Sequence, residues 1–268
     1  EPTNVAVKRR QDFPLLAHNI RKLTEGGKID FHLDLIAGLP YETFDRFARS
    51  FNDVFHLEAK EVQLGFLKML RGTHLRNMAD FYGYEYDAEA PYEVIANRDI
   101  SEEELNRIRD AEHAVDKFWN SGRFTSTMDY LIHGPYAGRY FELFDEIGQF
   151  QQEVGFPQRG YLLEELFRFF HRFLQSRGLD VFDKLRKDYY TNFSRRPKGF
   201  WEDGLDKKKR KQLLYTIAQD RDFLQKQGLE RRIIEKYTAI DPIDETTYLL
   251  TVFLQEEPAR RLEINYTF

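Results

Sequence analysis

The fold is indicated by residues 31–43, which read FHLDLIAGLPYET. Side chains alternate between apolar and polar along the first part of this stretch, as expected for a strand with one buried face. The predicted strand runs from Lys28 to Ala37 and has two faces, with Phe31, Leu33 and Leu35 on one and His32, Asp34 and Ile36 on the other.

Working outward from this strand, the neighbouring segments alternate between helix and strand. A second strand is predicted at 61–67, where Val62 and Leu64 share a face opposite to Gln63. A helix at 43–57 separates the two strands, and another begins after Asp12, which can cap it. The order helix, strand, helix, strand is typical of parallel β/α architecture.

The turn after the first strand has the features of a ligand-facing loop. Gly38 permits close approach of a ligand to the backbone, and Pro40 stiffens the exit. Glu42 lies just before a helix, where a carboxylate is favoured by the helix dipole. Strand ends of this kind carry the functional residues of β/α barrels. Taken alone, the pattern is more often that of an ordinary strand-to-helix turn.

The rest of the chain is predicted to be mostly helical. Ser101 and Glu104 form a capping box for a helix that runs to about Asn120. Other helices are expected at 74–82, 124–133, 136–154, 160–177, 181–193 and 207–227. The tail returns to β structure, with weak alternation at 230–240 and a hairpin formed by 247–255 and 260–266 around Glu256–Pro258. We therefore expect an α/β segment at 1–75 and a helical domain with a β tail at 76–268.

Composition excludes several classes of protein. The 268 residues include no Cys, so neither a disulfide nor a thiolate metal site can form from this chain. A formal net charge of -5 gives no overall attraction to nucleic acid or to an anionic membrane. No apolar run suits a membrane helix and no signal peptide is visible, which favours a cytoplasmic protein.

Two β/α units cannot cover both faces of a parallel sheet. The chain also begins at Glu1 and not at Met. We therefore expect either further strands upstream in a longer protein or another molecule that covers the sheet. The open sheet is also expected to promote self-association of this chain.

Three segments together resemble the radical S-adenosylmethionine (radical SAM) family. Residues 31–43 resemble the fifth barrel strand and its turn, and residues 63–73 resemble the sixth strand and its exit. Residues 6–9 are similar to the helix start after the fourth strand, with Lys8 in place of the usual Asn. The resemblance covers residues 1–75. The remainder resembles the C-terminal domain of an uncharacterised bacterial subgroup that carries an upstream cobalamin-binding domain.

The resemblance implies a partial (βα) TIM-like barrel and a radical reaction. Members of the family hold a [4Fe–4S] cluster on a CxxxCxxC loop and cleave S-adenosylmethionine reductively to a 5'-deoxyadenosyl radical. Because this chain has no Cys, the cluster loop is expected in the missing N-terminal half of the barrel, and the chain alone is expected to be inactive. Cobalamin is a further candidate cofactor, implied only by the subgroup.

The resemblance also assigns the candidate cofactor-binding residues. Ile36 would pack against the adenine, and Gly38 with Pro40 would shape the wall beside it. Asp34 and Gln63 would point into the barrel, as ligand contacts or as members of a salt bridge or hydrogen bond in the lumen. The remaining candidate is Arg9, which either binds the nucleotide's carboxylate or is an ordinary surface arginine.

Two other functions stay open. The chain could be a non-catalytic interaction module whose sheet packs on a partner. It could also bind RNA through the basic run at 207–211, although a solvated helix start is the favoured reading of that run and nucleic acid is not the expected partner. None of the seven His forms a pair with metal-ligand spacing, so no metal site is expected within the chain.

Overall fold

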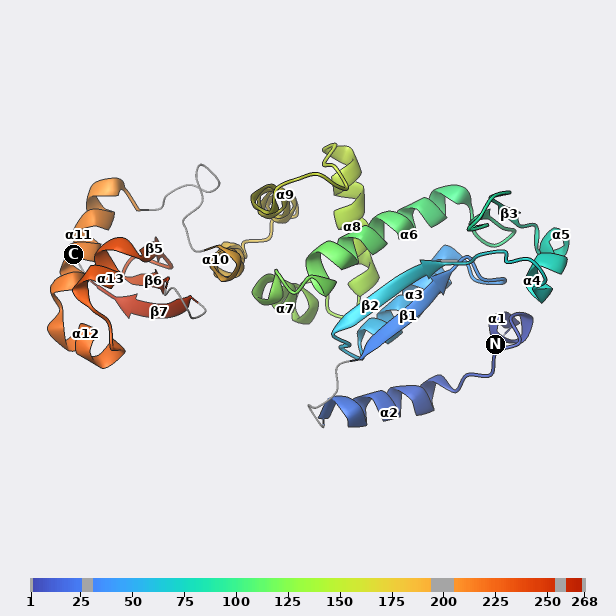
Figure 1. The fold of residues 1–268 in the computed structure, drawn as a ribbon, viewed down its shortest axis with the longest axis horizontal. Helices are drawn as coiled ribbons and strands as arrows, with labels where there is room; N and C mark the ends of the chain where they lie inside the picture. Colours follow the sequence, from blue (N-terminus) through green and yellow to red (C-terminus); the bar gives the residue numbers. More distant parts are fainter. Residues whose placement is uncertain (1, 26–30, 194–204, 254–258, 267–268) are drawn as a thin grey trace. The chain divides into compact units, whose positions relative to one another are not determined.

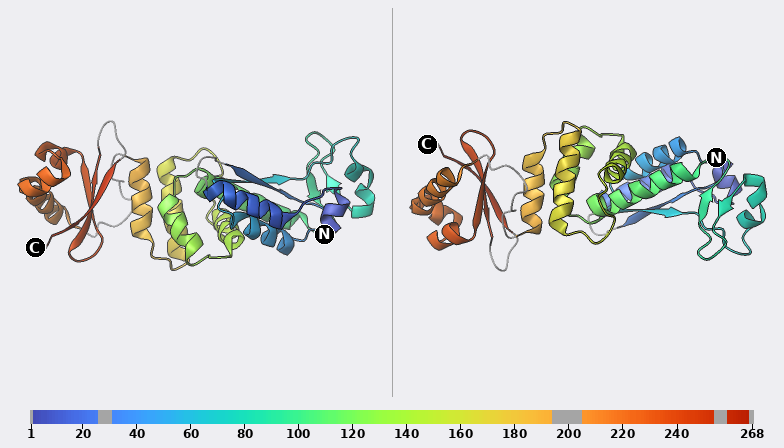
Figure 2. Two further views of the ribbon diagram at one scale, coloured as in Figure 1. Left: turned by 90° about the horizontal axis from the view of Figure 1, so that it is seen from below. Right: turned by 90° about the horizontal axis from the view of Figure 1, so that it is seen from above.

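The computed structural model describes residues 2–25, 31–193, 205–253 and 259–266. The chain divides into two compact units, Glu1–Gly160 and Tyr161–Phe268, and each is considered by itself. Figure 1 gives the labels of the elements, and Figure 2 shows them from two further sides. None of the helices in the described ranges combines the length and the apolar character needed to cross a membrane.

The first unit begins with the expected helix–strand alternation. Its first five elements are α1 (Pro2–Ala6), α2 (Phe13–Glu25), β1 (His32–Ala37), α3 (Phe44–Phe55) and β2 (Glu61–Phe66). Asp12 caps α2 through the backbone N–H of Leu15 at 3.1 Å. β1 and β2 pair in parallel, with Asp34 opposite Gln63. The predicted order is confirmed here, although residues 28–30 of the predicted strand lie outside the described part of the chain.

Helices cover one face of the β1–β2 pair. Val62 and Leu64 on that face are buried, and Leu33 packs against a small core formed by α2 and Leu57. Both views in Figure 2 show helices on one side of the strands only. The opposite face carries the polar side chains, which are exposed. The alternation is confirmed, but a two-stranded sheet does not close a barrel, so the assignment to barrel strands five and six stays a prediction.

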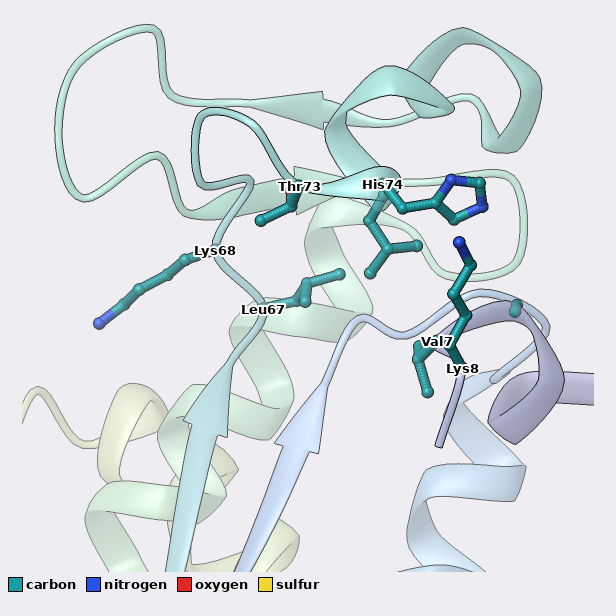
Figure 3. A pocket seen from close by; sticks show the side chains of 8 residues that line it. Val7, Lys8, Leu67, Lys68, Thr73 and His74 are labelled. Carbon is teal, nitrogen blue, oxygen red and sulfur yellow. The ribbon is translucent and has the colours of Figure 1, made fainter. Parts of the chain in front are cut away.

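The segment after β2 lies beyond the carboxyl ends of β1 and β2 (Figure 3). It contains α4 (His74–Asn77), α5 (Ala79–Tyr82), β3 (Glu85–Tyr86) and β4 (Val94–Ala96). The single helix predicted at 74–82 is wrong, because the chain breaks at Met78 between two short helices. The backbone N–H of Val94 donates to the carbonyl of Leu67 at 2.9 Å, and this bond ties the segment to the end of β2.

A helical layer completes the first unit. It comprises α6 (Glu102–Ala114), a π-helix, η1 (Val115–Asn120), α7 (Thr125–His133) and α8 (Tyr140–Glu153). The capping box of Ser101 and Glu104 is confirmed. Gly148 lets α8 approach α6 closely, because a Cβ there would lie 2.9 Å from the backbone of Asp110.

Aromatic packing joins this helical layer to the β/α segment. The ring of Phe141 at the start of α8 meets the rings of Phe47 and Phe51 on α3, at 5.8 and 5.5 Å between centroids. Residues 76–160 are therefore packed against the β/α segment within one compact unit. The division by packing falls at Gly160, and the domain boundary at residue 75 stays a prediction.

The second unit contains helices and an antiparallel sheet. Its elements are α9 (Leu163–Ser176), α10 (Phe182–Asn192), α11 (Lys207–Gln219), α12 (Arg221–Gln227), α13 (Arg231–Lys236), β5 (Thr238–Pro242), β6 (Thr247–Val252) and β7 (Arg260–Asn265). The strands lie in the order β5–β6–β7. Their core includes Leu250 and Ile264 with Ile217 from α11 and Ile234 from α13.

The expectation of a mostly helical domain with a C-terminal hairpin is confirmed, with three corrections. The helix predicted at 207–227 is interrupted at Asp220, whose side chain caps α12 through the N–H of Phe223 at 2.9 Å. The strand predicted at 230–240 is helix α13 followed by β5. β5 therefore makes the sheet three-stranded. The turn predicted at Glu256–Pro258 lies outside the described residues.

Candidate functional site

The carboxyl ends of β1 and β2 form the candidate site. Parallel strands place their carboxyl ends at one edge of the sheet, and the loops that follow them are where ligands bind in α/β folds. Here the loop after β1 contains Gly38 and Pro40, both buried. The loop after β2 lines a hollow of about 240 Å³, together with residues 6–8 from the start of the chain. Figure 3 shows the two strands pointing toward this hollow.

The turn after β1 depends on backbone conformations that favour glycine. Gly38 has φ +88°, in the left-handed region, and the three side-chain atoms nearest to an added Cβ would lie at 3.6–3.8 Å. That is ordinary contact, so the backbone angle and not lack of space selects glycine. Tyr41 also has a positive φ of 62°. A non-glycine residue in this region carries strain of about 1 kcal/mol or more, which the surroundings must hold in place.

Three polar side chains from residues 84–99 hold this turn. The carbonyl of Gly38 accepts hydrogen bonds from the Tyr84 hydroxyl at 2.9 Å and from Asn97 Nδ2 at 3.1 Å. The backbone N–H of Tyr41 donates to Asp99 Oδ2 at 2.8 Å. We call these three side chains the clamp. It fixes the loop after β1 through residues that lie 46 to 59 positions later in the chain.

The clamp is itself ordered by its surroundings. Asn97 Oδ1 accepts the backbone N–H groups of Asp99 at 2.7 Å and Ile100 at 3.1 Å, which shapes the turn that presents Asp99. Burial raises the pKa of Tyr84 above its ordinary value. Its hydroxyl therefore stays protonated and remains a hydrogen-bond donor to Gly38 across the physiological pH range.

The residues predicted for the nucleotide lie on or beside the open face of the sheet. Asp34 and Gln63 are register partners on adjacent strands, and Ile36 lies opposite Gly65. Ile36 is 42% exposed although it is a large apolar residue. The carboxylate of Asp34 is solvent-exposed, with the His32 ring 3.9 Å away. Gln63 donates to Glu61 at 2.8 Å.

The structure thus brings Asp34, Ile36 and Gln63 together on one face and places Gly38 and Pro40 at its end. Arg9 is exposed near the hollow but does not line it. Its backbone N–H bonds to Asn4 at 2.8 Å.

Sequence reasoning missed the clamp and the polar lining of the hollow. Lys8, Lys68, Thr73 and His74 line the hollow with four apolar residues. They come from two segments that are distant in sequence, and no short motif links them. Lys8 appeared only as a departure from the radical SAM pattern. For the clamp, the polar Asn97 and Asp99 just before the Ser101 capping box were the one available signal.

A second group of polar and ionisable side chains lies on α6 and η1, beside β2. The side chain of Asn120 bonds to both the N–H and the carbonyl of Val62, at 3.0 and 2.9 Å, and so occupies part of the outer edge of β2. Asn120 also donates to Asp116 at 2.8 Å. Burial, and secondarily the nearby Asp116, raises the pKa of Glu112 to about 7.

No group of three or more potential metal ligands occurs among the described residues.

Comparison with known proteins finds one family. A family model described as "Protein of unknown function (DUF4080)" matches residues 80–258. That domain is found in proteins associated with radical SAM and cobalamin domains. No curated protein matches the chain. The match begins just before Tyr84, so all three clamp residues belong to the matched region.

Proposed function

The chain belongs to the DUF4080 family, whose function is unknown, and from this premise we propose that it is the C-terminal part of a radical SAM enzyme. In this proposal β1 and β2 are the fifth and sixth strands of the barrel. S-adenosylmethionine binds at their carboxyl ends, and the DUF4080 region supports that wall. The occurrence of the domain in radical SAM and cobalamin-associated proteins supports the assignment.

The observation that carries the proposal is the clamp on Gly38. A buried carbonyl must be hydrogen-bonded whatever the role of its loop, but here both donors come from a distant segment, so residues of the DUF4080 region set the position of the loop after β1. Fixing the loop holds any ligand beside it in one position, and such preorganisation contributes strongly to catalysis and binding. The clamp therefore gives the DUF4080 region a physical role at the same strand ends that the proposal assigns to the nucleotide.

The open face has the chemistry that a nucleoside needs. Ile36 offers an exposed apolar surface at the end of β1 for a flat base, and the positive φ of the buried Gly38 sets the turn beside it. Arg9 is exposed and can reach a carboxylate. When bound, S-adenosylmethionine with its cluster would supply the radical chemistry. The chain has no Cys, so the cluster thiolates would come from outside these 268 residues, as would a cobalamin site.

The test is 5'-deoxyadenosine release by the full-length protein, purified anaerobically with iron and sulfide restored and a reductant added. We expect release that depends on the cluster. Ile36→Ser should raise the KM for S-adenosylmethionine about fivefold or more, because apolar contact with the base is lost. The matched control is Ile243→Ser, since Ile243 is 39% exposed against 42% for Ile36, and it should leave KM unchanged. Absence of both release and S-adenosylmethionine binding would overturn the proposal.

RNA binding by the second unit is a second candidate, supported by a separate observation. Residues 206–236 hold ten Lys or Arg and five Asp or Glu, a net charge of +5 in a chain of net charge -5. The basic run 207–211 occupies the first turns of α11, where the helix dipole disfavours cations. Anisotropy of a labelled single-stranded RNA tests this. Binding that weakens steeply with salt, and is lost when Lys207, Lys208 and Lys211 are changed to Gln, would support it.

A further inference from the structure

Two basic side chains face one another across the hollow at the end of β2. Figure 3 shows the ammonium group of Lys8 and the ring of His74 directed into the same space, whereas Lys68 points away from it. Lys8 follows α1, and His74 is the first residue of α4. The two side chains therefore reach the hollow from segments more than sixty positions apart. Neither residue is among those assigned to the nucleotide, although the hollow lies at the end of β2, where the function proposed above also places S-adenosylmethionine.

The electrostatics of the hollow are unbalanced. Its lining holds Lys8, Lys68 and His74 but no acidic residue. Among the described residues, neither Lys8 nor His74 forms a side-chain hydrogen bond or an ion pair. Both residues are exposed, so water screens their charges from one another, and an anion between them can bind both. The lining thus provides donors and positive charge without an acceptor to match them.

The backbone conformation of Lys8 is a further sign of a binding position. Lys8 has φ 55°, a left-handed conformation that non-glycine residues rarely adopt. Strain of this kind tends to occur at ligand-binding positions. The neighbouring Thr73 is already engaged, because its hydroxyl donates to the carbonyl of Leu70 at 2.8 Å. The free donors that face the hollow are therefore the Lys8 ammonium and the His74 ring.

We propose that this hollow is an oxyanion site in which Lys8 and His74 bind the phosphate group of a small-molecule ligand. Charge-assisted hydrogen bonds from an ammonium and an imidazole match a phosphate that carries more than one negative charge. Residues 6, 7, 67 and 75 also line the hollow and are apolar, so their side chains offer no acceptor that would compete with the ligand. The site requires neither a cluster nor S-adenosylmethionine, so it stands or falls separately from the function proposed above.

The test is binding of inorganic phosphate to the 268-residue chain, followed by NMR of the histidine ring protons. We expect the His74 signal to shift on titration. Lys8→Gln and His74→Gln should each weaken binding about tenfold, the loss typical of one charge-assisted hydrogen bond. Lys22→Gln and His18→Gln, at exposed positions on α2, are the matched controls and should bind as the parent chain does. Circular dichroism confirms that each variant folds.

A parallel titration with acetate separates the two sources of an oxyanion. Phosphate binding that is tighter than acetate binding supports a phosphate site. Tighter binding of acetate would overturn the phosphate assignment in favour of a carboxylate ligand. Absence of any His74 shift, or equal weakening in the α2 control variants, would overturn the site itself.

Discussion

Replacing Tyr84 by Phe removes the buried hydroxyl that bonds to the carbonyl of Gly38 at 2.9 Å. That carbonyl keeps its bond from Asn97 at 3.1 Å, so the expected loss of unfolding free energy is about 1 kcal/mol, the net value of one hydrogen bond. Asn97→Ala should cost more, about 2–3 kcal/mol, because its side chain also accepts the N–H groups of Asp99 and Ile100.

The double variant is the informative case. With both donors gone, the buried Gly38 carbonyl loses both of the side-chain partners seen in the structure, and an unpaired buried acceptor costs about 1–3 kcal/mol. The combined loss should therefore exceed the sum of the single losses by about 1 kcal/mol. Tyr130→Phe is the control, because Tyr130 belongs to the same unit and is 41% exposed, so loss of its hydroxyl should change stability little.

Urea unfolding followed by tryptophan fluorescence measures these losses. Trp119 belongs to the first unit and packs against Phe55 at 4.7 Å between ring centroids. In a Trp201→Phe background, Trp119 is the only Trp and reports the first unit alone. Single and double losses that simply add, or a Tyr84→Phe variant as stable as its parent, would refute the view that the two side chains jointly hold the loop.

Other outcomes follow from the same structure. The pKa of Glu112 is raised from 4.5 to about 7. The folded protein therefore favours the protonated side chain, and this contribution to stability is complete below about pH 4.5 and is lost as pH rises through about 7. Glu112→Gln should therefore leave the free energy of unfolding in urea unchanged near pH 4 and raise it by about 1–2 kcal/mol near pH 8, a value reduced for partial exposure. Equal effects at both pH values would contradict this. Tyr190→Phe should destabilise the second unit by about 1–3 kcal/mol, because its hydroxyl donates to the buried Asp241 at 2.7 Å, and calorimetry would show a lowered transition. The sheet has an open face, and β1 pairs with no strand other than β2 in the described part of the chain. The chain should therefore be a dimer or larger at micromolar concentration, and a monomer by light scattering would exclude that.

Much of the local structure could be predicted from the sequence. The alternation in 31–37 and 61–67 identified both strands and their faces, because a side-chain period of two is written directly in the residue order. The caps at Asp12 and Ser101 were equally readable, since a cap involves residues only three positions apart.

Helix breaks were harder to predict. One helix ends and the next begins at Met78, with no Gly or Pro to mark the break. Asp220 both ends one helix and caps the next. Residues 231–236 form a helix although their pattern resembled a strand, because Ile234 packs into the core of the second unit. Packing decided these cases, and intrinsic propensity is weak enough to be overridden by it.

The candidate site divides in the same way. The sequence could propose the residues that lie on or directly after the strands, because the strand pattern is local: Asp34, Ile36, Gly38, Pro40 and Gln63. It could not propose the clamp, whose residues lie 46 to 59 positions after the loop that they hold.

By itself, the sequence determined the parallel strand pair, the face that each residue occupies, the position of the glycine turn and the absence of thiolates, since each depends on residue type or on spacing within a few positions. Only the tertiary structure decided that Tyr84, Asn97 and Asp99 hold that turn, and that Lys8 and His74 face the same hollow. Such contacts join segments many residues apart, and their geometry is set by how the whole unit packs, which no local pattern encodes.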